Sequence, residues 1–297
     1  MNNYIRLHQK HFNFKRFVTE ALHEDVGEGD HTSLSIIPQK QKGKMQLLVK
    51  EDGVIAGVEA AREIIKIFDK TIRIKIFIKD GQPVKRGDVV FVVEGKIQRL
   101  LTIERLLLNI MQRMSGIATR TARLQTLCRG TKAKVIDTRK TTPGFRFFEK
   151  WAVVIGGGAN HRYGLSDMIL IKDNHIDFAG GIKEAIDAAH VYLKKNKKKL
   201  PIEVETRTLD DVRKVLEHGG VKRIMLDNYS PMQTREAVQL IGKGVEIESS
   251  GGINENNIVE YARAGVDFIS IGALTHHVRS LDMSLKALIA AASHKSR

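Results

Sequence analysis

IEVETRTLDDVRKVLEHGGVKRIMLDN, residues 202–228, predicts a strand, a helix and a second strand. The two ends, IEVET and RIMLDN, are short β-branched or apolar runs that stop at a polar residue. The stretch between them has apolar residues spaced near 3.6 and ends in two glycines, which commonly end a helix. Buried strands separated by helices predict a parallel sheet that is covered on both faces.

The same unit recurs from residue 134 onward, where the runs AKVIDT, MILIKD, VEIESS and DFISIGA predict further strands. The last four strands end at Glu205, Asp227, Ser250 and Gly272, in steps of 22, 23 and 22 residues. Each step is the length of one strand, loop and helix. So regular a repeat favours a closed or nearly closed α/β barrel over an open doubly wound sheet.

The first part of the chain has a different pattern. Runs such as IRIKIFI alternate with period two, as expected for a sheet with one solvated face, and we predict an α+β fold there. Within the long helical stretch that follows, Ser115 and Gly116 give the clearest boundary. We predict an N-terminal domain over residues 1–114 and a catalytic barrel over 115–276, with a helix over 277–297 packing back on the first domain.

The composition excludes several classes of protein. The 297 residues suffice for about two domains. Because 42% of them are hydrophobic and no window approaches 18 apolar residues, we expect neither disorder nor a membrane span. The apolar run of a secretory signal is also missing from the first residues. Cys128 is the single cysteine, which favours a reducing, cytoplasmic setting.

The net charge of +15 is compatible with nucleic acid, an anionic membrane or small polyanionic substrates as partners. Much of the excess lies in the KKNKKK run, Lys194 to Lys199, which we interpret as a solvated helix end and loop. Aromatic residues make up only 6% of the chain, and it has no helix-turn-helix, RNP or zinc-finger pattern. We therefore expect no nucleic-acid partner.

Residues able to do polar chemistry end the strands of the second half. In a parallel barrel all carboxyl ends meet at one face, where the loops build the active site. Any one such residue is explained equally well by ordinary turn chemistry. Six such positions, each at the end of a predicted strand, predict a shared site. They are Arg139 with Lys140, Lys172, Glu205, Asp227, Ser250 and Gly272.

Two successive loops, ESSGGINENN and SIGALTHH, combine glycines with hydroxyls. In barrels the loops after the last two strands commonly bind phosphate through backbone N–H groups. We therefore predict a phosphate at this end of the site, although a tight turn alone would also explain the glycine pair.

Glu205 and Asp227 follow neighbouring strands in a site otherwise rich in cations. Two such acids fit Mg²⁺ held through water or substrate oxygens, or the stabilisation of a cationic sugar centre. Salt bridges to the site lysines are the alternative. We expect Glu203, on the same strand as Glu205, to face the helix layer instead.

The block GGGANHRYGLSDMILIKDNH supplies His161 and Arg162, and then Lys172. An arginine fork suits carboxylate or phosphate, whereas a lysine acts as a point charge. The glycines do not match a dinucleotide fingerprint, which should open a helix after the first strand of a βα unit. His161 and His175 have no third metal ligand at a recognisable spacing, and we interpret His175 as structural.

Nearly the whole chain resembles the quinolinate phosphoribosyltransferase family, also called carboxylating nicotinate-nucleotide pyrophosphorylases. The resemblance is carried by long motifs, among them EDVGEGDHTS, ERLLLNIMQRMSGIAT, DTRKTTPGFR, EKWAVVIGGGANHR and LIKDNHI. It implies an N-terminal α/β sandwich and an incomplete, roughly seven-stranded α/β barrel. It also implies transfer of phosphoribose from phosphoribosyl pyrophosphate to quinolinate, with decarboxylation to nicotinate mononucleotide in NAD biosynthesis. Mg²⁺ and a homodimer, or a multiple of dimers, are implied too.

The same resemblance implies roles for individual residues. Glu205, Asp227, Lys140 and Lys172 match catalytic positions, and the two acids also match the positions that face Mg²⁺. Arg105 matches an arginine that completes the neighbouring subunit's site. The quinolinate positions are Arg105, Thr138, Arg139, His161, Arg162 and Lys172. The phosphoribosyl pyrophosphate positions are Lys140, Glu205, Asp227, Ser250, Gly251, Gly252, Gly272, Ala273 and His276.

Two alternatives stay open from the sequence. A sibling of the same fold, such as a molybdenum-transport accessory protein or a nicotinate-specific enzyme, would keep the phosphate loops but need fewer carboxylate-binding forks. Arg139, His161 and Arg162 together favour a dicarboxylate. A basic nucleic-acid-binding protein on a barrel scaffold is the other alternative, and strong salt-dependent binding of generic RNA or DNA would favour it.

Overall fold

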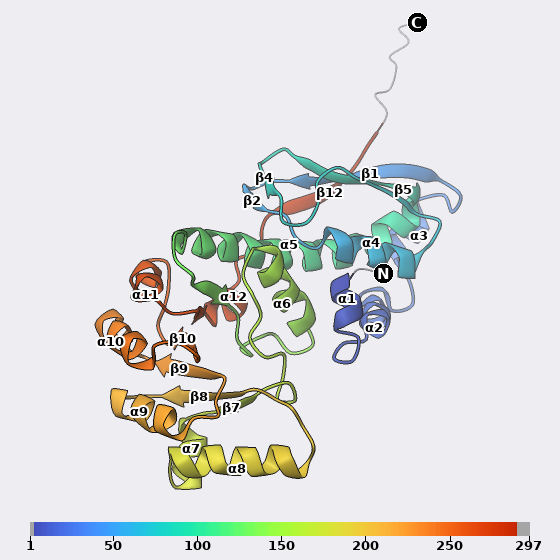
Figure 1. Ribbon diagram of the computed structural model, residues 1–297. Coiled ribbons are helices and arrows are strands. Elements are labelled where there is room, and N and C mark those ends of the chain that lie inside the picture. Colours follow the sequence, from blue (N-terminus) through green and yellow to red (C-terminus); the bar gives the residue numbers. More distant parts are fainter. Residues whose placement is uncertain (1–2, 290–297) are drawn as a thin grey trace, which may run out of the picture. The chain divides into compact units, whose positions relative to one another are not determined.

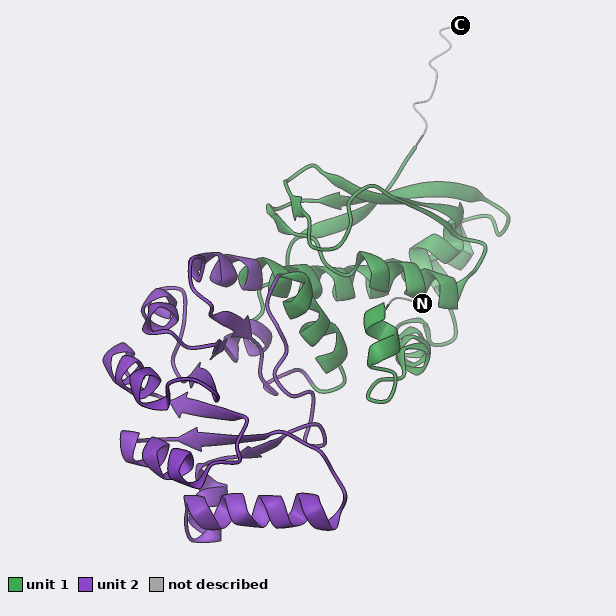
Figure 2. Cartoon of the chain, viewed as in Figure 1, with its two compact units in different colours: residues 1–120, 143–156, 278–297 green, residues 121–142, 157–277 purple. Residues whose placement is uncertain are grey.

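The computed structural model describes residues 3–289, and most of their helices and strands are labelled in Figure 1. The chain divides into two compact units, coloured separately in Figure 2. Unit 1 comprises residues 1–120, 143–156 and 278–297, and unit 2 comprises residues 121–142 and 157–277. The units therefore alternate along the chain, in contrast to the single boundary that we predicted between residues 114 and 115.

The predicted boundary lies inside one uninterrupted helix, α5 (Ile97–Leu127). Gly116 does not interrupt it. A Cβ atom on Gly116 would collide with the backbone carbonyl of Arg279, so the glycine serves close packing within unit 1. From sequence, a glycine that permits such a contact looks the same as one that ends a helix.

Unit 1 is built on an antiparallel sheet of four strands in the order β12-β1-β5-β3. Strand β1 has the burial pattern expected for one packed face, because Met45, Leu47 and Val49 are buried and alternate with more exposed residues. A two-stranded sheet, β2-β4, adds to it. The strands are β1 (Lys42–Val49), β2 (Gly53–Val54), β3 (Arg73–Ile76), β4 (Pro83–Val84), β5 (Val89–Lys96) and β12 (Met283–Ala287).

The expected helix over residues 277–297 is wrong where the structure describes it. Residues Met283–Ala287 form β12, which pairs antiparallel with β1 and places Leu285 opposite Leu47. Met283 and Leu285 are buried whereas Lys286 is exposed, and this period of two suits a strand rather than a helix. Residues 290–297, the rest of the predicted helix, lie outside the described residues.

Unit 1 also contains helix α6, which follows in the chain the loop that carries Arg139 and Lys140. Its buried Glu149 accepts bonds from the Arg113 guanidinium of α5 at 2.7 and 2.9 Å. Aromatic rings from the N-terminal segment pack on it, with Phe12, between α1 and α2, stacked on Phe147 and Tyr4 of α1 stacked on Trp151. Besides α5, the helices are α1 (Asn3–Leu7), α2 (Phe14–Val26), α3 (His31–Ile36), α4 (Val58–Phe68) and α6 (Arg146–Ile155).

Unit 2 is built on a parallel sheet in the order β6-β11-β10-β9-β8-β7. The first strand pairs with the last, as in a barrel, and a single parallel bridge joins Ile136 of β6 to Ala159. That bridge stands where a seventh strand would be. The strands are β6 (Lys134–Ile136), β7 (Ile169–Ile171), β8 (Ile202–Thr206), β9 (Arg223–Asp227), β10 (Glu246–Ser250) and β11 (Phe268–Ser270). The predicted α/β class, with an antiparallel N-terminal sheet and a parallel α/β sheet, is confirmed.

Local sequence signals set the helices between these strands. Thr208 begins α9 with a capping box, since its hydroxyl accepts from the Asp211 N–H and the Asp211 carboxylate accepts from the Thr208 N–H. Ser230 and Pro231 begin α10 in a similar way, and a glycine follows each of the two helices. The helices are α7 (Asp173–Ala179), α8 (Ile182–Lys195), α9 (Leu209–His218), α10 (Pro231–Ile241), α11 (Ile258–Ala264) and α12 (Ala273–His276).

Over residues 3–289, none of the helices combines the length and the apolar character needed to cross a membrane.

Replacing Leu285 by Ala tests the contribution of β12 to unit 1. Leu285 is 5% exposed, so the change should lower the free energy of unfolding by about 2–5 kcal/mol. Urea unfolding followed by circular dichroism measures it. Lys286→Ala, on the exposed side of the same strand, is the control and should change stability by about 0.5 kcal/mol or less. Equal effects of the two changes would contradict a packed β12.

Candidate active site

The carboxyl ends of the parallel strands of unit 2 surround one cavity of about 970 Å³. Fourteen of the fifteen residues that the sequence assigned to a site line it. Parallel strands bring their carboxyl ends to one edge, so residues far apart in the chain meet there. They are Thr138, Arg139, Lys140, His161, Arg162, Lys172, Glu205, Asp227, Ser250, Gly251, Gly252, Gly272, Ala273 and His276.

Arg105 is the exception. It lies on α5 in unit 1, where its side chain is exposed, and it does not line the cavity. Its expected place in a neighbouring subunit's site stays a prediction.

The loop after β6 presents two cations to the cavity, Arg139 and Lys140. Short-range bonds hold the loop backbone, because the Lys140 N–H donates to the Thr138 hydroxyl at 3.0 Å. The Thr275 hydroxyl, at the other end of unit 2 in sequence, donates to the Lys140 carbonyl at 2.7 Å. The first and last βα loops are thereby tied together, with both side chains of the Arg-Lys pair left exposed.

Arg162 is the most buried cation that lines the cavity, at 8% exposed, and its Nη1 donates to the Met168 carbonyl at 3.2 Å. Burial and the nearby positive charge of Arg139 lower the pKa of the Arg162 guanidinium. Both effects disfavour the charged form, and a bound anion would offset both. This side of the cavity is therefore suited to an anionic ligand.

The acids lie on the next strands. Glu205, at the end of β8, is 6% exposed, and its Oε2 lies 3.1 Å from the Nζ of Lys172. The Asp227 carboxylate, at the end of β9, accepts a bond of 2.7 Å from the Asn228 amide. The salt-bridge alternative is thus realised for Glu205. Both carboxylates still line the cavity.

Glycines form the wall at the end of β10. Gly251 and Gly252 have φ of 94° and 62°, in the left-handed region that other residues rarely adopt. A Cβ atom on Gly251 would collide with the Asn228 side chain, while one on Gly252 would meet nothing within 4 Å. Asn228 itself has φ of 58°, and its N–H donates to the Ser250 carbonyl at 2.9 Å. The turns after β9 and β10 are therefore packed against each other.

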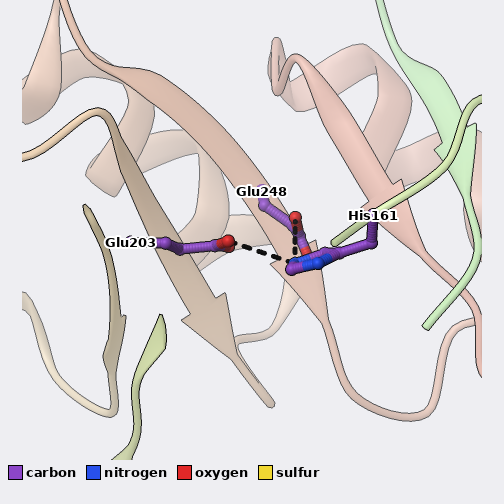
Figure 3. Close-up of side chains that lie close together, drawn as sticks. All are labelled: His161, Glu203 and Glu248. Atoms are coloured by element: carbon purple, nitrogen blue, oxygen red, sulfur yellow. Dashed lines mark ion pairs between the residues drawn. The ribbon is translucent and has the colours of Figure 1, made fainter. Parts of the chain in front are cut away.

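A group of buried charged residues was missed from the sequence. His161 Nε2 lies 3.1 Å from Glu203 Oε2 and 3.5 Å from Glu248 Oε2 (Figure 3). The expectation that Glu203 faces the helix layer is wrong, because residues two apart on a strand share a face and Glu203 lies two before Glu205. The same period-two rule, applied to Glu248 and Ser250, is the signal that could have found Glu248.

Burial dominates the electrostatics of these two acids, which are both 0% exposed. It raises the pKa of Glu203 to about 7. Burial, together with the charge of Glu203, also raises the pKa of Glu248 to about 7. Two carboxylates so close together in a dry environment disfavour each other's ionisation.

Asp137 fixes the backbone that carries His161. It is fully buried, and its carboxylate accepts from the His161 N–H at 2.9 Å and from the Asn160 amide at 2.6 Å. Asp137 follows β6 directly, so the segment around His161 is attached to the sheet beside which it runs.

Comparisons with known proteins agree with the motifs. The family model described as quinolinate phosphoribosyl transferase, C-terminal domain, matches residues 117–286, and the corresponding N-terminal domain matches residues 30–115. A chloroplastic nicotinate-nucleotide pyrophosphorylase [carboxylating] of Arabidopsis thaliana is 42% identical over 290 residues, which cover 93% of this chain and 83% of the relative. A probable nicotinate-nucleotide pyrophosphorylase [carboxylating] of Bacillus subtilis is 38% identical, with 93% of each chain covered.

Solved structures agree as well. The crystal structure of NadC from Streptococcus pyogenes superposes with a TM-score of 0.87 at 38% identity, covering 93% of this chain and 97% of that one.

Gly251→Ala should destabilise the protein more than Gly252→Ala. Both changes put a side chain at positive φ, which costs about 1 kcal/mol, but only the first must also displace Asn228. The midpoint of thermal unfolding measures the difference. Equal midpoints for the two variants would show that Gly251 and Asn228 are not in contact.

Proposed function

The chain belongs to the quinolinate phosphoribosyltransferase family, and we propose that its two substrates bind and react in the cavity of unit 2. The reaction transfers phosphoribose from phosphoribosyl pyrophosphate to quinolinate and releases pyrophosphate and CO₂. The product, nicotinate mononucleotide, enters NAD biosynthesis. One observation carries the assignment to this cavity: cations for a dicarboxylate and acids for a sugar centre line the same space of about 970 Å³.

The quinolinate side consists of Arg139, His161 and Arg162, with Thr138 and Lys172 beside them. Quinolinate carries two adjacent carboxylates, and each arginine offers a planar fork that can bind a carboxylate through two hydrogen bonds. The lowered pKa of Arg162 supports this role, because a bound carboxylate would restore the stability of its charged form.

The phosphoribosyl pyrophosphate side lies along the ends of the last strands. Ser250, Gly251 and Gly252 at the end of β10 offer backbone that a phosphate can approach closely, since two of them lack a side chain. Gly272, Ala273 and His276 would contribute from the neighbouring loop and α12. Lys140 would face the diphosphate, and it already lies against Gly272, where a Cβ atom would come within 3.0 Å of its Cδ.

Glu205 and Asp227 are proposed to face the ribose. As the C1′–O bond to pyrophosphate breaks, positive charge develops at C1′, and carboxylates fixed nearby stabilise it. The quinolinate nitrogen then bonds to C1′ and becomes a pyridinium. That cation accepts the electron pair left at C2 when CO₂ departs, and a proton replaces the carboxylate.

The two acids also fit Mg²⁺, which binds carboxylate oxygens and keeps several waters and substrate phosphates as further ligands. Both line the cavity, and they come from adjacent strands β8 and β9. Bound there with the diphosphate, the ion would neutralise the charge of the leaving group. Glu205 and Asp227 would hold it through water or substrate oxygens.

Lys172 would change partner when substrate binds. Before binding, its ion pair with Glu205 at 3.1 Å balances both charges at the cavity wall. A quinolinate carboxylate would attract the ammonium and leave Glu205 free to face the ribose. Lys172 would thereby couple the binding of quinolinate to the binding of phosphoribosyl pyrophosphate.

We also propose a homodimer, or a multiple of dimers, in which Arg105 reaches the neighbouring subunit's site. The support is that Arg105 is exposed on α5, although the matched family motif assigns it to quinolinate. The cytoplasmic location expected from the lone cysteine stays a prediction.

Purified protein with Mg²⁺ and phosphoribosyl pyrophosphate should consume quinolinate and leave nicotinate unchanged, because nicotinate lacks the second carboxylate that the paired arginines bind. Chromatography of the nucleotide and capture of CO₂ from carboxyl-labelled quinolinate measure the reaction. Arg162→Met should raise the quinolinate KM roughly 10- to 100-fold, the size of a lost charge-assisted hydrogen bond. A preference for nicotinate would refute the assignment.

Arg105→Ala should abolish activity if the dimer shares its sites, and so should Glu205→Gln. Mixed under conditions of proven subunit exchange, the two inactive variants should regain up to about a quarter of the wild-type activity. Exchange forms mixed dimers, and in each of them one of the two sites has both Glu205 and Arg105 intact. Turnover of quinolinate measures the recovery. Absence of recovery would count against sharing.

A further inference from the structure

A buried group of charged residues lies at the quinolinate side of the cavity, and two of its members, His161 and Glu248, line the cavity. We call it the floor cluster, and it consists of His161, Glu203, Glu248 and Arg223. Figure 3 shows the two carboxylates, from β8 and β10, pointing at the His161 ring from different strands. Each member is at most 8% exposed. Four such residues meeting in the interior have a steep desolvation cost, so their arrangement calls for a physical explanation.

Strand register brings the acids and Arg223 together. Arg223 pairs with Glu203 across β8 and β9, and with Glu246 across β9 and β10. Its Nη1 donates to Glu248 Oε2 at 2.9 Å and lies 4.0 Å from Glu203 Oε2. Its Nε and Nη2 bond Glu246 at 3.2 and 3.1 Å, and its guanidinium lies over the Phe268 ring. Arg223 is therefore a fixed counter-ion that cannot turn towards the cavity.

His161 is held from the opposite direction as well. Its Nδ1 accepts from the Arg162 N–H at 2.7 Å, so in the neutral ring the proton is on Nε2, the atom that faces Glu203 and Glu248. Its own N–H is bonded to Asp137. Contacts within the protein on both sides of the ring therefore set its orientation and its tautomer, and these contacts do not involve a bound substrate.

His161, Glu203 and Glu248 also have the spacing of a metal-binding group, since one ligand atom from each lies within 4.8 Å of the others. A metal there would place a second positive charge beside the Arg223 guanidinium, which already lies 2.9 Å from Glu248. The local charge therefore favours a histidine held by two acids over a bound cation.

We propose that Glu203 and Glu248 are positioning residues: they hold His161 by Nε2 and thereby set the geometry of the His161–Arg162 pair that binds quinolinate. The inference rests on the proposed function of that pair. His161 and Arg162 are adjacent in the chain and both line the cavity, so rotation of the ring would disturb its bond to the Arg162 N–H. On the phosphoribosyl pyrophosphate side, Glu205 and Ser250 follow Glu203 and Glu248 by two residues on β8 and β10, but the two buried acids contact His161 and Arg223, so binding of phosphoribosyl pyrophosphate should depend on them less.

The test uses Glu203→Gln and Glu248→Gln in the full-length protein. Each should raise the quinolinate KM about tenfold, because an amide replaces a carboxylate that lies against His161 Nε2, with the phosphoribosyl pyrophosphate KM changed less than about twofold. The matched control is Glu246→Gln, which removes a contact of Arg223 but none of His161, and it should leave the quinolinate KM within about twofold. Equal shifts in both KM values, or an equal effect of the control, would overturn the proposal.

Binding of quinolinate by calorimetry separates this proposal from the proposed function. If the wild-type protein does not bind quinolinate, the proposed function fails. If it binds and the effect of Glu203→Gln is undiminished in a His161→Ala background, the acid does not act through the histidine and this inference fails. Loss of the effect in that background supports it.

A measurement on the unaltered protein covers the case in which a variant does not fold. Nitrogen-15 spectra of the wild-type imidazoles should show His161 with its proton on Nε2 and with Nδ1 unprotonated. An Nδ1–H tautomer, or a ring averaging between tautomers, would overturn the proposal.

Discussion

The common direction of six paired strands is the constraint on which the rest of unit 2 depends. Parallel pairing from β6 through β11 puts every carboxyl end at one edge, so Arg139, Glu205 and Ser250 share a cavity although more than a hundred residues separate the first from the last. Reversing one strand would move its terminal side chain to the other end of the sheet. The chemistry of the family is therefore inseparable from the topology.

Charged residues form two groups in this unit. At the cavity wall, the Lys172 side chain is 47% exposed in its ion pair with Glu205, and we propose that it exchanges this partner for a substrate carboxylate. Arg223 and Glu203, together with Glu248 at the cavity wall, are buried with fixed partners. Exposed pairs contribute little to stability, whereas a buried pair is costly to break. The first group is thus suited to binding and release, and the second group to holding geometry.

Unit 1 depends on contacts between segments that are distant in the chain. Strand β12 joins β1, and α6 packs its buried Glu149 against Arg113 of α5. Consequently the segment after the barrel and the helix after the site loop both belong to unit 1. The prediction of a single domain boundary fails because the chain passes from one unit to the other several times.

The sequence by itself determined the βα repeat and the convergence of strand ends, because apolar period and strand spacing are local properties. Other cavity residues, such as Thr138, Ala273 and His276, were identified only by the resemblance to the family. Only the tertiary structure decided that residues 283–287 form a strand, that Gly116 lies within a helix and that Glu203 and Glu248 meet at His161. Those outcomes depend on which partner a segment finds across the fold. The local apolar period does not specify which distant segment a strand or a side chain contacts. The energy of the contacts between the two segments specifies it.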